Sequence, residues 1–383
     1  MAAGPKTTIW PIEPHTIAKI DILEAYLVAY FQILGTCRRQ EFLYIDGFAG
    51  PNRYTNRDWG SPSAAINAAI TAIGNTTNAW VAGNIHFAFV ECDPKRYAVL
   101  DDSLSEYSPI PGISVLRFNA QFTDALPLIK NAVPEPFTSN APLFAFIDPF
   151  GATGAPFAFV SEILNSPCSE VLLNFDADGV SRIYQAKQNA NHEELLTQIF
   201  GDTTWQTRLH DGQSFDEQCR TAFELYKEKL RGLPGVRYIF EVEMRGKTGK
   251  MNYFLVFASK HPLGLVKMKE AMKRITQNGS YTFNDTDVGQ QALLRFDEPK
   301  AYYMSLYSHF KQRRVKYDGE NDDVTAFALN HTPFFNAKSM LKLLEDEEFI
   351  TASSTDPKRR RGTFNHAVTE IDFHGKAQNG QLF

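Results

Sequence analysis

The feature that most constrains the fold of this chain is a series of short apolar runs that alternate with helical segments. The runs are rich in Phe, Val, Ile and Leu, and the segments between them repeat apolar residues at helical spacing. This alternation favours an α/β fold with a doubly wound, Rossmann-like parallel sheet. A helix is expected over 16–34, and the expected strands cover residues 41–46, 85–93, 113–120, 142–151 and 170–178.

Each expected strand ends beside a residue with a carboxylate or an amide side chain. In open α/β sheets, ligands bind outside the carboxyl ends of the strands. We therefore expect the functional site at this edge of the sheet. The residues concerned are Asp46, Glu91, Asn119, Asp148 and Asp176.

The remainder of the first domain is expected to close the sheet with a hairpin. A polar, helical insertion covers about 180–232, and after it the runs VRYIFEVEM and MNYFLVFAS flank RGKTGK, which suits a tight turn. This pattern predicts an antiparallel hairpin at the edge of a mixed sheet. The first domain then spans 1–276, and 277–299 reads as a linker.

A second, smaller domain is expected over residues 300–383. Its segment 337–350 is amphipathic and predicts a helix, and the segment after it carries a basic Lys-Arg-Arg-Arg turn. A helix, a short strand and a basic turn resemble the second half of a winged helix-turn-helix. We expect a winged-helix-like domain there.

The overall charge excludes two classes of protein. The 39 Lys and Arg against 44 Asp and Glu leave a formal net charge of −5, which rules out a polycation and an acidic disordered tail. Residues 300–383 contain 12 basic and 11 acidic residues, and the remainder contains 27 and 33. Nucleic-acid binding would therefore depend on local patches.

The sequence also argues against a membrane protein and a metal site. No apolar stretch reaches the ~18 residues that a membrane helix needs, and the N-terminus lacks the apolar core of a signal peptide. The four cysteines are scattered, which suggests reduced thiols in a cytoplasmic protein. No histidine has a partner at metal-ligand spacing, so we expect no metal.

The segment Asp46-Gly47-Phe48-Ala49-Gly50 follows the first expected strand. Two glycines there let the backbone turn sharply and approach a ligand closely. The segment matches neither the dinucleotide fingerprint nor the phosphate-binding loop. It suits a cofactor with a cationic amino-acid end and no phosphate, but a purely structural turn explains it equally well.

Glu91 ends the second strand, with Asp93 two residues later. A carboxylate at this position can accept hydrogen bonds from the two hydroxyls of a ribose. A solvated acid at a strand end is the alternative. Asn119, at the end of the third strand, could read an adenine edge, although a structural role is the more common one for such a residue.

The strongest motif is Asp148-Pro149-Phe150-Gly151. Pro149 favours an extended Asp148, so that the carboxylate projects beyond the strand, and Phe150 offers a flat face. Carboxylate and carbonyl oxygens can accept the hydrogens of an aromatic amine, while the ring stacks on an extruded base. An Asp-Pro turn that merely closes a strand is the alternative interpretation.

Taken together, these segments resemble a known family. Thr16 to Lys19 (T-x-x-K), Y-I-D-G-F-A-G-P, G-S-P-S-A-A, F-V-E-C-D and F-I-D-P-F-G occur in the order seen in three-Cys-motif partner proteins, which are S-adenosylmethionine-dependent methyltransferase-like proteins with a terminal winged helix. More distantly, D-P-F-G is similar to the motif of tRNA guanine-N2 dimethyltransferases. In the related amino-methyltransferase motif (D/N)-P-P-(Y/F), a second Pro stands where this chain has Phe150.

The resemblance implies S-adenosyl-L-methionine as the cofactor and assigns roles to individual residues. The methionine part would lie against the segment from Asp46 to Gly50, Glu91 would bind the ribose, and Lys19 would meet the cofactor carboxylate. Asp148, Pro149 and Phe150 would face the acceptor base. The cofactor-binding residues implied are Lys19, Asp46, Gly47, Phe48, Ala49, Gly50, Glu91, Asp93 and Asn119.

Two basic clusters lie in the C-terminal domain and are candidates for phosphate contacts. Such clusters are as often simply solvated faces. The nucleic-acid-binding residues expected are Arg313, Arg314, Lys316, Lys358, Arg359, Arg360 and Arg361.

The leading hypothesis is an enzyme that transfers a methyl group from S-adenosyl-L-methionine to an exocyclic amino group of a base in DNA or RNA. The second is a non-catalytic nucleic-acid-binding partner, in which the methyltransferase fold is a scaffold that works with a radical-SAM-type three-Cys-motif protein. A third, a nicotinamide-dependent reductase, shares the fold class but lacks the glycine fingerprint.

Overall fold

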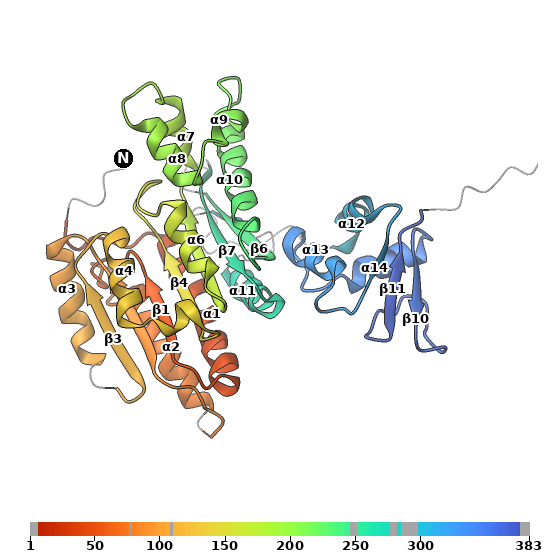
Figure 1. Cartoon of the computed structure of the whole chain (residues 1–383), viewed down its shortest axis with the longest axis horizontal. Helices are drawn as coiled ribbons and strands as arrows, with labels where there is room; N and C mark the ends of the chain where they lie inside the picture. Colours follow the sequence, from red (N-terminus) through yellow and green to blue (C-terminus); the bar gives the residue numbers. More distant parts are fainter. Residues whose placement is uncertain are drawn as a thin grey trace, which may run out of the picture.

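The computed structural model describes residues 7–76, 78–107, 110–245, 251–275, 282–284 and 298–375. A central sheet with helices on both faces forms the larger part, and a smaller domain lies beside it (Figure 1). Among the helices in these ranges, none has both the length and the apolar character needed to cross a membrane.

The central sheet has the strand order β3-β2-β1-β4-β5-β7-β6-β8. The first five strands are parallel, β7 runs antiparallel to both of its neighbours, and β8 pairs in parallel with β6. The doubly wound sheet and its antiparallel edge are therefore confirmed. The strands are β1 (Phe42–Asp46), β2 (Ile85–Val90), β3 (Ile113–Phe118), β4 (Leu143–Ile147), β5 (Ser169–Phe175), β6 (Tyr238–Arg245), β7 (Met251–Ser259) and β8 (Thr282–Asn284).

Two hydrophobic cores, one on each face, hold the sheet between its helices. Successive side chains of β1 point to opposite faces, so Leu43 and Ile45 enter one core, while Phe42 and Tyr44 enter the other. The first core receives α4 (Phe122–Ala132), α6 (Phe157–Asn165), α7 (Ala177–Gln185), α8 (His192–Phe200) and α10 (Phe215–Arg231). The second receives α1 (Pro14–Cys37), α2 (Ser61–Thr76), α3 (Pro94–Leu104) and α11 (Pro262–Ile275).

Short helical pieces complete this part of the chain. They are η1 (Ser105–Tyr107), α5 (Glu135–Thr138) and α9 (Trp205–Arg208), while η2 (Pro299–Ala301) packs against α12 and α14 of the C-terminal domain. Helices α7 to α10 occupy the stretch expected to be a helical insertion. Within it, Ser214 and Glu217 form a reciprocal capping box that begins α10.

Three details differ from the sequence-based expectation. Helix α1 begins at Pro14, two residues before the predicted start, because proline is favoured in the first turn of a helix. Ser61 is the first residue of α2 instead of its cap. Strand β8 lies inside the predicted linker 277–299, most of which is outside the described residues, as is the predicted turn at 246–250.

The C-terminal domain has its own core and a small antiparallel sheet in the order β10-β11-β9. The elements occur in the order helix, strand, helix, helix, strand, strand. They are α12 (Tyr303–Phe310), β9 (Arg314–Lys316), α13 (Asp323–His331), α14 (Lys338–Asp346), β10 (Thr351–Ser354) and β11 (Val368–Asp372).

Helix α13 attaches this domain to β6 and α11. The Asn330 side chain continues the edge of β6, since its Oδ1 accepts the Ile239 amide at 2.8 Å and its Nδ2 donates to the Arg237 carbonyl at 2.9 Å. Lys269 of α11 is fully buried and donates to the carbonyls of Leu329, Thr332 and Phe334 at 2.7–3.0 Å. The two domains are thus joined by directional hydrogen bonds, and those from Lys269 to Leu329 and Thr332 are buried.

Candidate active site

A cavity of about 610 Å³ opens at the carboxyl edge of the sheet. Its walls come from the loops after β1, β4 and β5, from the first turns of α1, and from the segment before α1. The lining residues that the sequence predicted are Lys19, Phe48, Ala49, Gly50, Asp148, Pro149, Phe150 and Asp176. The predicted edge of the sheet therefore carries a cavity.

Asp148 lies in this cavity with both carboxylate oxygens engaged. Lys19 donates to Oδ2 at 2.5 Å, and Asn174 donates through Nδ2 to Oδ1 at 2.8 Å. Lys19 also lies 5.1 Å from the centre of the Tyr253 ring. The resemblance assigned Lys19 to a cofactor carboxylate, whereas the structure pairs it with Asp148.

Phe150 is the exposed aromatic residue of the site. Its side chain is 49% exposed, which is unusual for a large hydrophobic residue. The ring meets the Trp10 ring at 6.0 Å, edge to face, and the Arg96 guanidinium lies 5.5 Å from it and 5.0 Å from Trp10. At the mouth of the cavity, the exposed Phe150 ring therefore lies against the Trp10 ring and the Arg96 guanidinium.

Asp46 is fully buried at the end of β1. Burial raises its pKa to about 7, although the facing Ser61 side chain and the Phe48 amide oppose the rise. Oδ1 accepts the Phe48 amide at 3.2 Å, whereas no hydrogen bond within the described part of the chain reaches Oδ2. A buried carboxylate oxygen without a partner is costly, so this atom fits a cationic ligand group.

The two glycines of this loop have different roles. Gly50 has φ +63°, and a Cβ placed on it would have no atom within 4 Å, so the backbone faces open space in the cavity wall. A Cβ on Gly47 would lie 2.9 Å from the buried Phe122 ring. Gly50 therefore leaves room for a ligand, whereas Gly47 makes room for packing.

Glu91, Asp93 and Asn119 lie outside the lining of the cavity, as do Asp46 and Gly47. Glu91 is buried at the end of β2, and its Oε1 accepts the Asp93 amide at 2.7 Å. Asp93 caps α3 by accepting from the amides of Lys95 and Arg96. The Asn119 amide donates to the Glu91 and Cys92 carbonyls. Glu91 and Asp46 are near enough that each charge disfavours the other.

No protein-family model matches the chain, and no curated protein matches it. Among solved structures, an O-methyltransferase from Bacillus cereus in complex with SAH is 14% identical, with a TM-score of 0.34 over 65% of this chain and 82% of that chain. Cofactor-bound Rv0187 from MTB is 13% identical, with a TM-score of 0.35 over 67% of this chain and 84% of that chain. The likeness is distant. We therefore describe the fold from the order of the strands in the central sheet and not from these similarities.

Two functional candidates were missed by the sequence analysis. Asn174 is only 9% exposed, lines the cavity and keeps its Oδ1 without a partner among the described residues. A polar residue inside the apolar run of β5 was the available signal. Asn52, with φ +55°, binds the Gly60 and Ser63 amides and the Ser63 and Ser103 hydroxyls, and so orders the loop between β1 and α2.

The basic clusters of the C-terminal domain are partly engaged. Arg359 forms a bidentate ion pair with Glu345, and Arg361 donates to the Glu345 carbonyl. Arg314 pairs with Asp372 at 2.9 Å. The remaining exposed cations predicted to bind nucleic acid are Arg313, Lys316, Lys358 and Arg360.

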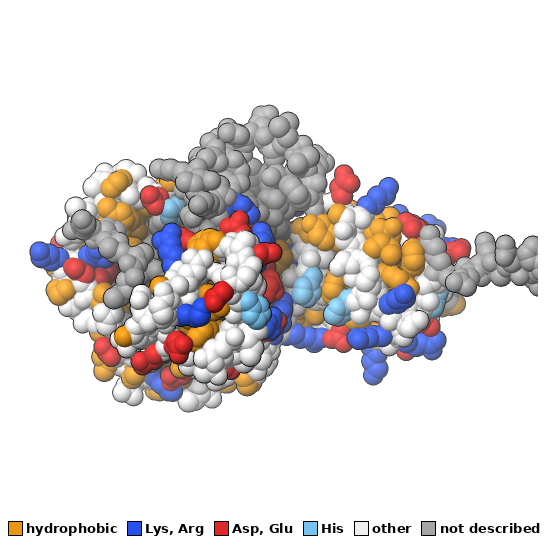
Figure 2. Space-filling model, turned by 90° about the horizontal axis from the view of Figure 1, so that it is seen from above, with side chains coloured by type: hydrophobic (Ala, Val, Ile, Leu, Met, Phe, Trp, Pro, Cys, Tyr) orange, Lys and Arg blue, Asp and Glu red, His pale blue; other side chains and the backbone are white. Residues whose placement is uncertain are grey.

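On the face seen in Figure 2, Lys and Arg side chains lie around the rim of the C-terminal domain, interspersed with Asp and Glu side chains. This face therefore carries no continuous basic stripe. In the described ranges, no cluster of three His, Cys, Asp or Glu side chains could hold a metal ion.

Proposed function

We propose that the chain is an S-adenosyl-L-methionine-dependent methyltransferase that acts on an exocyclic amino group of a nucleic-acid base. The observation that carries the proposal is Asp148, held between Lys19 and Asn174 in a cavity at the carboxyl edge, beside the exposed ring of Phe150. The site is rich in hydrogen-bond acceptors next to a stacking surface. That combination suits an aromatic amine.

The residues after β1 fit the cofactor. The unpartnered Oδ2 of Asp46 suits the ammonium group of its methionine part, and the open space at Gly50 lets the backbone lie against it. Glu91, buried at the next strand end, would hold the ribose. When bound, the cofactor supplies a methyl group on a sulfonium, which a nucleophile can attack in line.

The chain's own residues would position the acceptor. Lys19 holds the Asp148 carboxylate in place by donating to one oxygen, and Asn174 orients it through its second oxygen. The remaining lone pairs of Asp148, with Oδ1 of Asn174, accept the amine hydrogens and direct the nitrogen lone pair. Phe150 stacks on the base.

The C-terminal domain would bind the nucleic acid as a winged helix. Its order of elements is that of a winged helix, and the basic loop between β10 and β11 is its wing. The exposed cations of the two clusters would contact phosphates and position the strand. The sequence motifs support membership of the three-Cys-motif partner family, with a radical-SAM-type protein as a further partner.

Two measurements test the proposal. Calorimetry should show binding of S-adenosylhomocysteine, and tritium should pass from labelled cofactor to DNA or RNA. The Asp148→Ala variant should lose at least about a hundredfold in transfer rate while it still binds S-adenosylhomocysteine. Asp124→Ala, an exposed acid of α4, is the control and should transfer normally. Full transfer by Asp148→Ala would refute the assignment.

A second candidate function is a non-catalytic scaffold that binds nucleic acid. It is favoured by one observation, namely that both Asp148 oxygens already have partners in Lys19 and Asn174. A scaffold would bind nucleic acid and transfer no tritium. Transfer above background by the native protein, abolished by Asp148→Ala, excludes it.

A further inference from the structure

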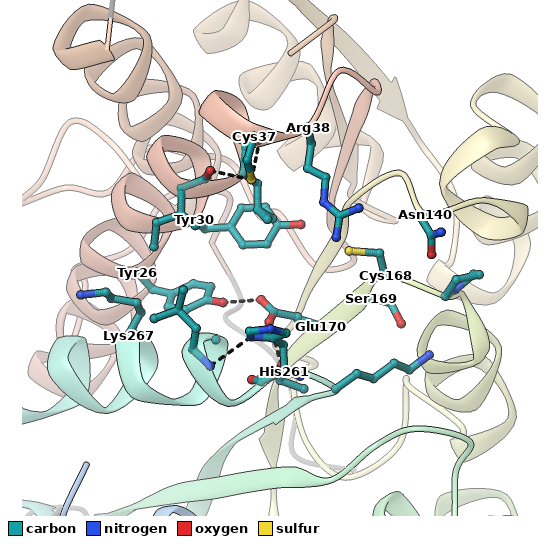
Figure 3. A pocket seen from close by; sticks show the side chains of 17 residues that line it. Tyr26, Tyr30, Cys37, Arg38, Asn140, Cys168, Ser169, Glu170, His261 and Lys267 are labelled. Atoms are coloured by element: carbon teal, nitrogen blue, oxygen red, sulfur yellow. Dashed lines mark hydrogen bonds between the residues drawn. The ribbon is translucent and has the colours of Figure 1, made fainter. Parts of the chain in front are cut away.

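A second cavity lies at the opposite, amino edge of the sheet, away from the candidate active site. It measures about 380 Å³ and is enclosed by the end of α1, the start of β5 and the start of α11 (Figure 3). Its position follows from the register, because Glu170 near the start of β5 faces Ser259 at the end of β7. Nothing in the proposed methyl transfer uses this cavity.

The walls of this cavity are largely apolar. Aromatic rings and aliphatic side chains line it on several sides, and a volume of this size suits a ligand with a ring or a short alkyl chain. The apolar lining residues are Tyr26, Ile33, Leu34, Pro167 and Leu263.

Among the described residues, Glu170 is the one carboxylate that lines the cavity, and both of its oxygens already accept hydrogen bonds. Tyr26 donates to Oε2 of Glu170, and Ser259 donates to Oε1 at 2.8 Å. Burial raises the pKa of Glu170. Glu170 therefore has little capacity to attract a cationic ligand.

Three polar side chains of the cavity, Tyr30, Arg38 and Lys260, have hydrogen-bond donors to offer a ligand. Tyr30 is 6% exposed, and its hydroxyl has no partner among the described residues; burial raises its pKa well above the usual value, so it stays a protonated phenol. The Arg38 guanidinium has no ion pair in the described ranges, lines the same cavity as Tyr30 (Figure 3), and lies near enough to Cys168 for its charge to act on that thiol. Lys260 donates one hydrogen to the Ser166 carbonyl at 2.6 Å and keeps two others.

We propose that this cavity binds a small organic carboxylate with an apolar body. The carboxylate would lie against Arg38 and the Tyr30 hydroxyl, with Lys260 nearby, and the body would fill the space between α1 and α11. An Arg guanidinium forms two parallel bonds with a carboxylate, and a buried phenol that lacks a partner gains one. A cation at the same place would meet the like charges of Arg38 and Lys260.

The test compares three probes of the same shape: 3-phenylpropionate, 3-phenylpropanamide and 3-phenylpropylamine. Calorimetry and ligand-observed NMR on the full chain should show that the carboxylate binds at least about tenfold more tightly than the amide, with no binding of the amine. Equal binding of carboxylate and amide, or no binding of the carboxylate, would overturn the proposal.

Variants and a labelling experiment locate the bound probe. Arg38→Met should weaken 3-phenylpropionate binding at least about tenfold and Tyr30→Phe about fivefold. Arg39→Met, an exposed neighbour outside the cavity, is the matched control. The probe should also slow iodoacetamide labelling of Cys168, which lines the cavity, but not of the exposed Cys92.

These outcomes are independent of the methyltransferase proposal. Binding that survives Arg38→Met, or that leaves Cys168 labelling unchanged, would show that the probe binds elsewhere and would refute the site. Because Tyr30→Phe removes one oxygen and leaves the packed ring in place, its effect on binding is not confounded by unfolding.

Discussion

At the scale of single residues, the candidate active site contains polar groups of two kinds: those whose hydrogen-bond partners are present, and buried acceptors that have none. Asp148 has a cation and an amide donor, whereas the buried Asp46 and Asn174 each keep one oxygen without a partner in the described chain. Buried acceptors without partners lower stability, so natural chains rarely keep them without a use. Asn174 lines the cavity and would gain a partner from a ligand there, and in the proposed function the ammonium group of the cofactor would pair with Asp46.

The raised pKa of Asp46 gives a pH dependence with a definite sign. With a pKa of about 7, the ligand-free protein holds Asp46 protonated in acid and ionised in base. An ammonium group beside Asp46 favours the ionised form, so binding below pH 7 must release a proton. We expect the Kd for S-adenosylhomocysteine to rise by about tenfold per pH unit below 7 and to level off above it.

Calorimetry between pH 5.5 and 8.5 measures this profile, and Asp46→Asn should flatten it. The same variant tests the linked effect on folding. Since the folded pKa is raised, ionising buried Asp46 lowers stability progressively between about pH 4 and 7, by at most about 4 kcal/mol above that range. Asp46→Asn should therefore raise the Tm of the ligand-free protein at pH 8 and not at pH 4. A flat native profile would contradict the assignment.

At the scale of elements, local patterns predicted most of the fold, and long-range contacts account for what they missed. The period-two run of β1 and the strand-end acids are local signals, so the sheet and its functional edge could be predicted. Strand β8 is three residues long and has too little pattern to detect. The partners of Asp148 lie 129 and 26 residues away in sequence, at Lys19 and Asn174, which no local motif could reveal.

The basic loop between β10 and β11 shows that the sequence also does not reveal which charged residues are engaged in ion pairs. Sequence alone treats Lys358 to Arg361 as one basic cluster, yet Arg359 and Glu345 are only 11% and 9% exposed and tie the loop to α14. Arg359→Met would leave Glu345 buried without its partner and should cost about 3 kcal/mol of stability in urea unfolding.

By contrast, Lys358 and Arg360 are exposed, and the double variant Lys358→Gln/Arg360→Gln should leave stability unchanged. It should weaken nucleic-acid binding, measured by fluorescence anisotropy, and reduce the slope of log K against log salt by about 2. A loss of stability in the double variant with an unchanged salt slope would argue against phosphate contacts by this loop.

At the scale of the whole molecule, the two domains meet on the side of the sheet away from the cavity. Tyr238, at the start of β6, pairs with Ser259 and so marks the amino edge, and Arg237 and Ile239 beside it contact α13. No described residue of the C-terminal domain lines the active-site cavity. In the proposed function, this domain therefore binds nucleic acid at a distance from the cavity and does not cover the reacting base. To direct a base into the cavity, it must keep a fixed orientation relative to the sheet.

Lys269 is the residue that should hold that orientation. Burial lowers the pKa of Lys269, but its ammonium group donates to three carbonyls of the C-terminal domain and lies 4.5 Å from the Phe240 ring. Lys269→Met keeps the length of the side chain and leaves those carbonyls without a donor. We expect a loss of about 3 kcal/mol and release of the domain. Small-angle scattering should show a larger radius of gyration, and limited proteolysis should cut before α12.

Lys267→Met is the matched control, because Lys267 lies on the same helix and pairs only with Glu270 of that helix among the described residues. In the control, the radius of gyration and the cleavage pattern should match those of the native protein. If the domain is a recruiting module, Lys269→Met should still bind S-adenosylhomocysteine and nucleic acid, yet methylate long substrates more slowly. Unchanged scattering in Lys269→Met would show that Asn330 and the β6 edge suffice to hold the two domains together.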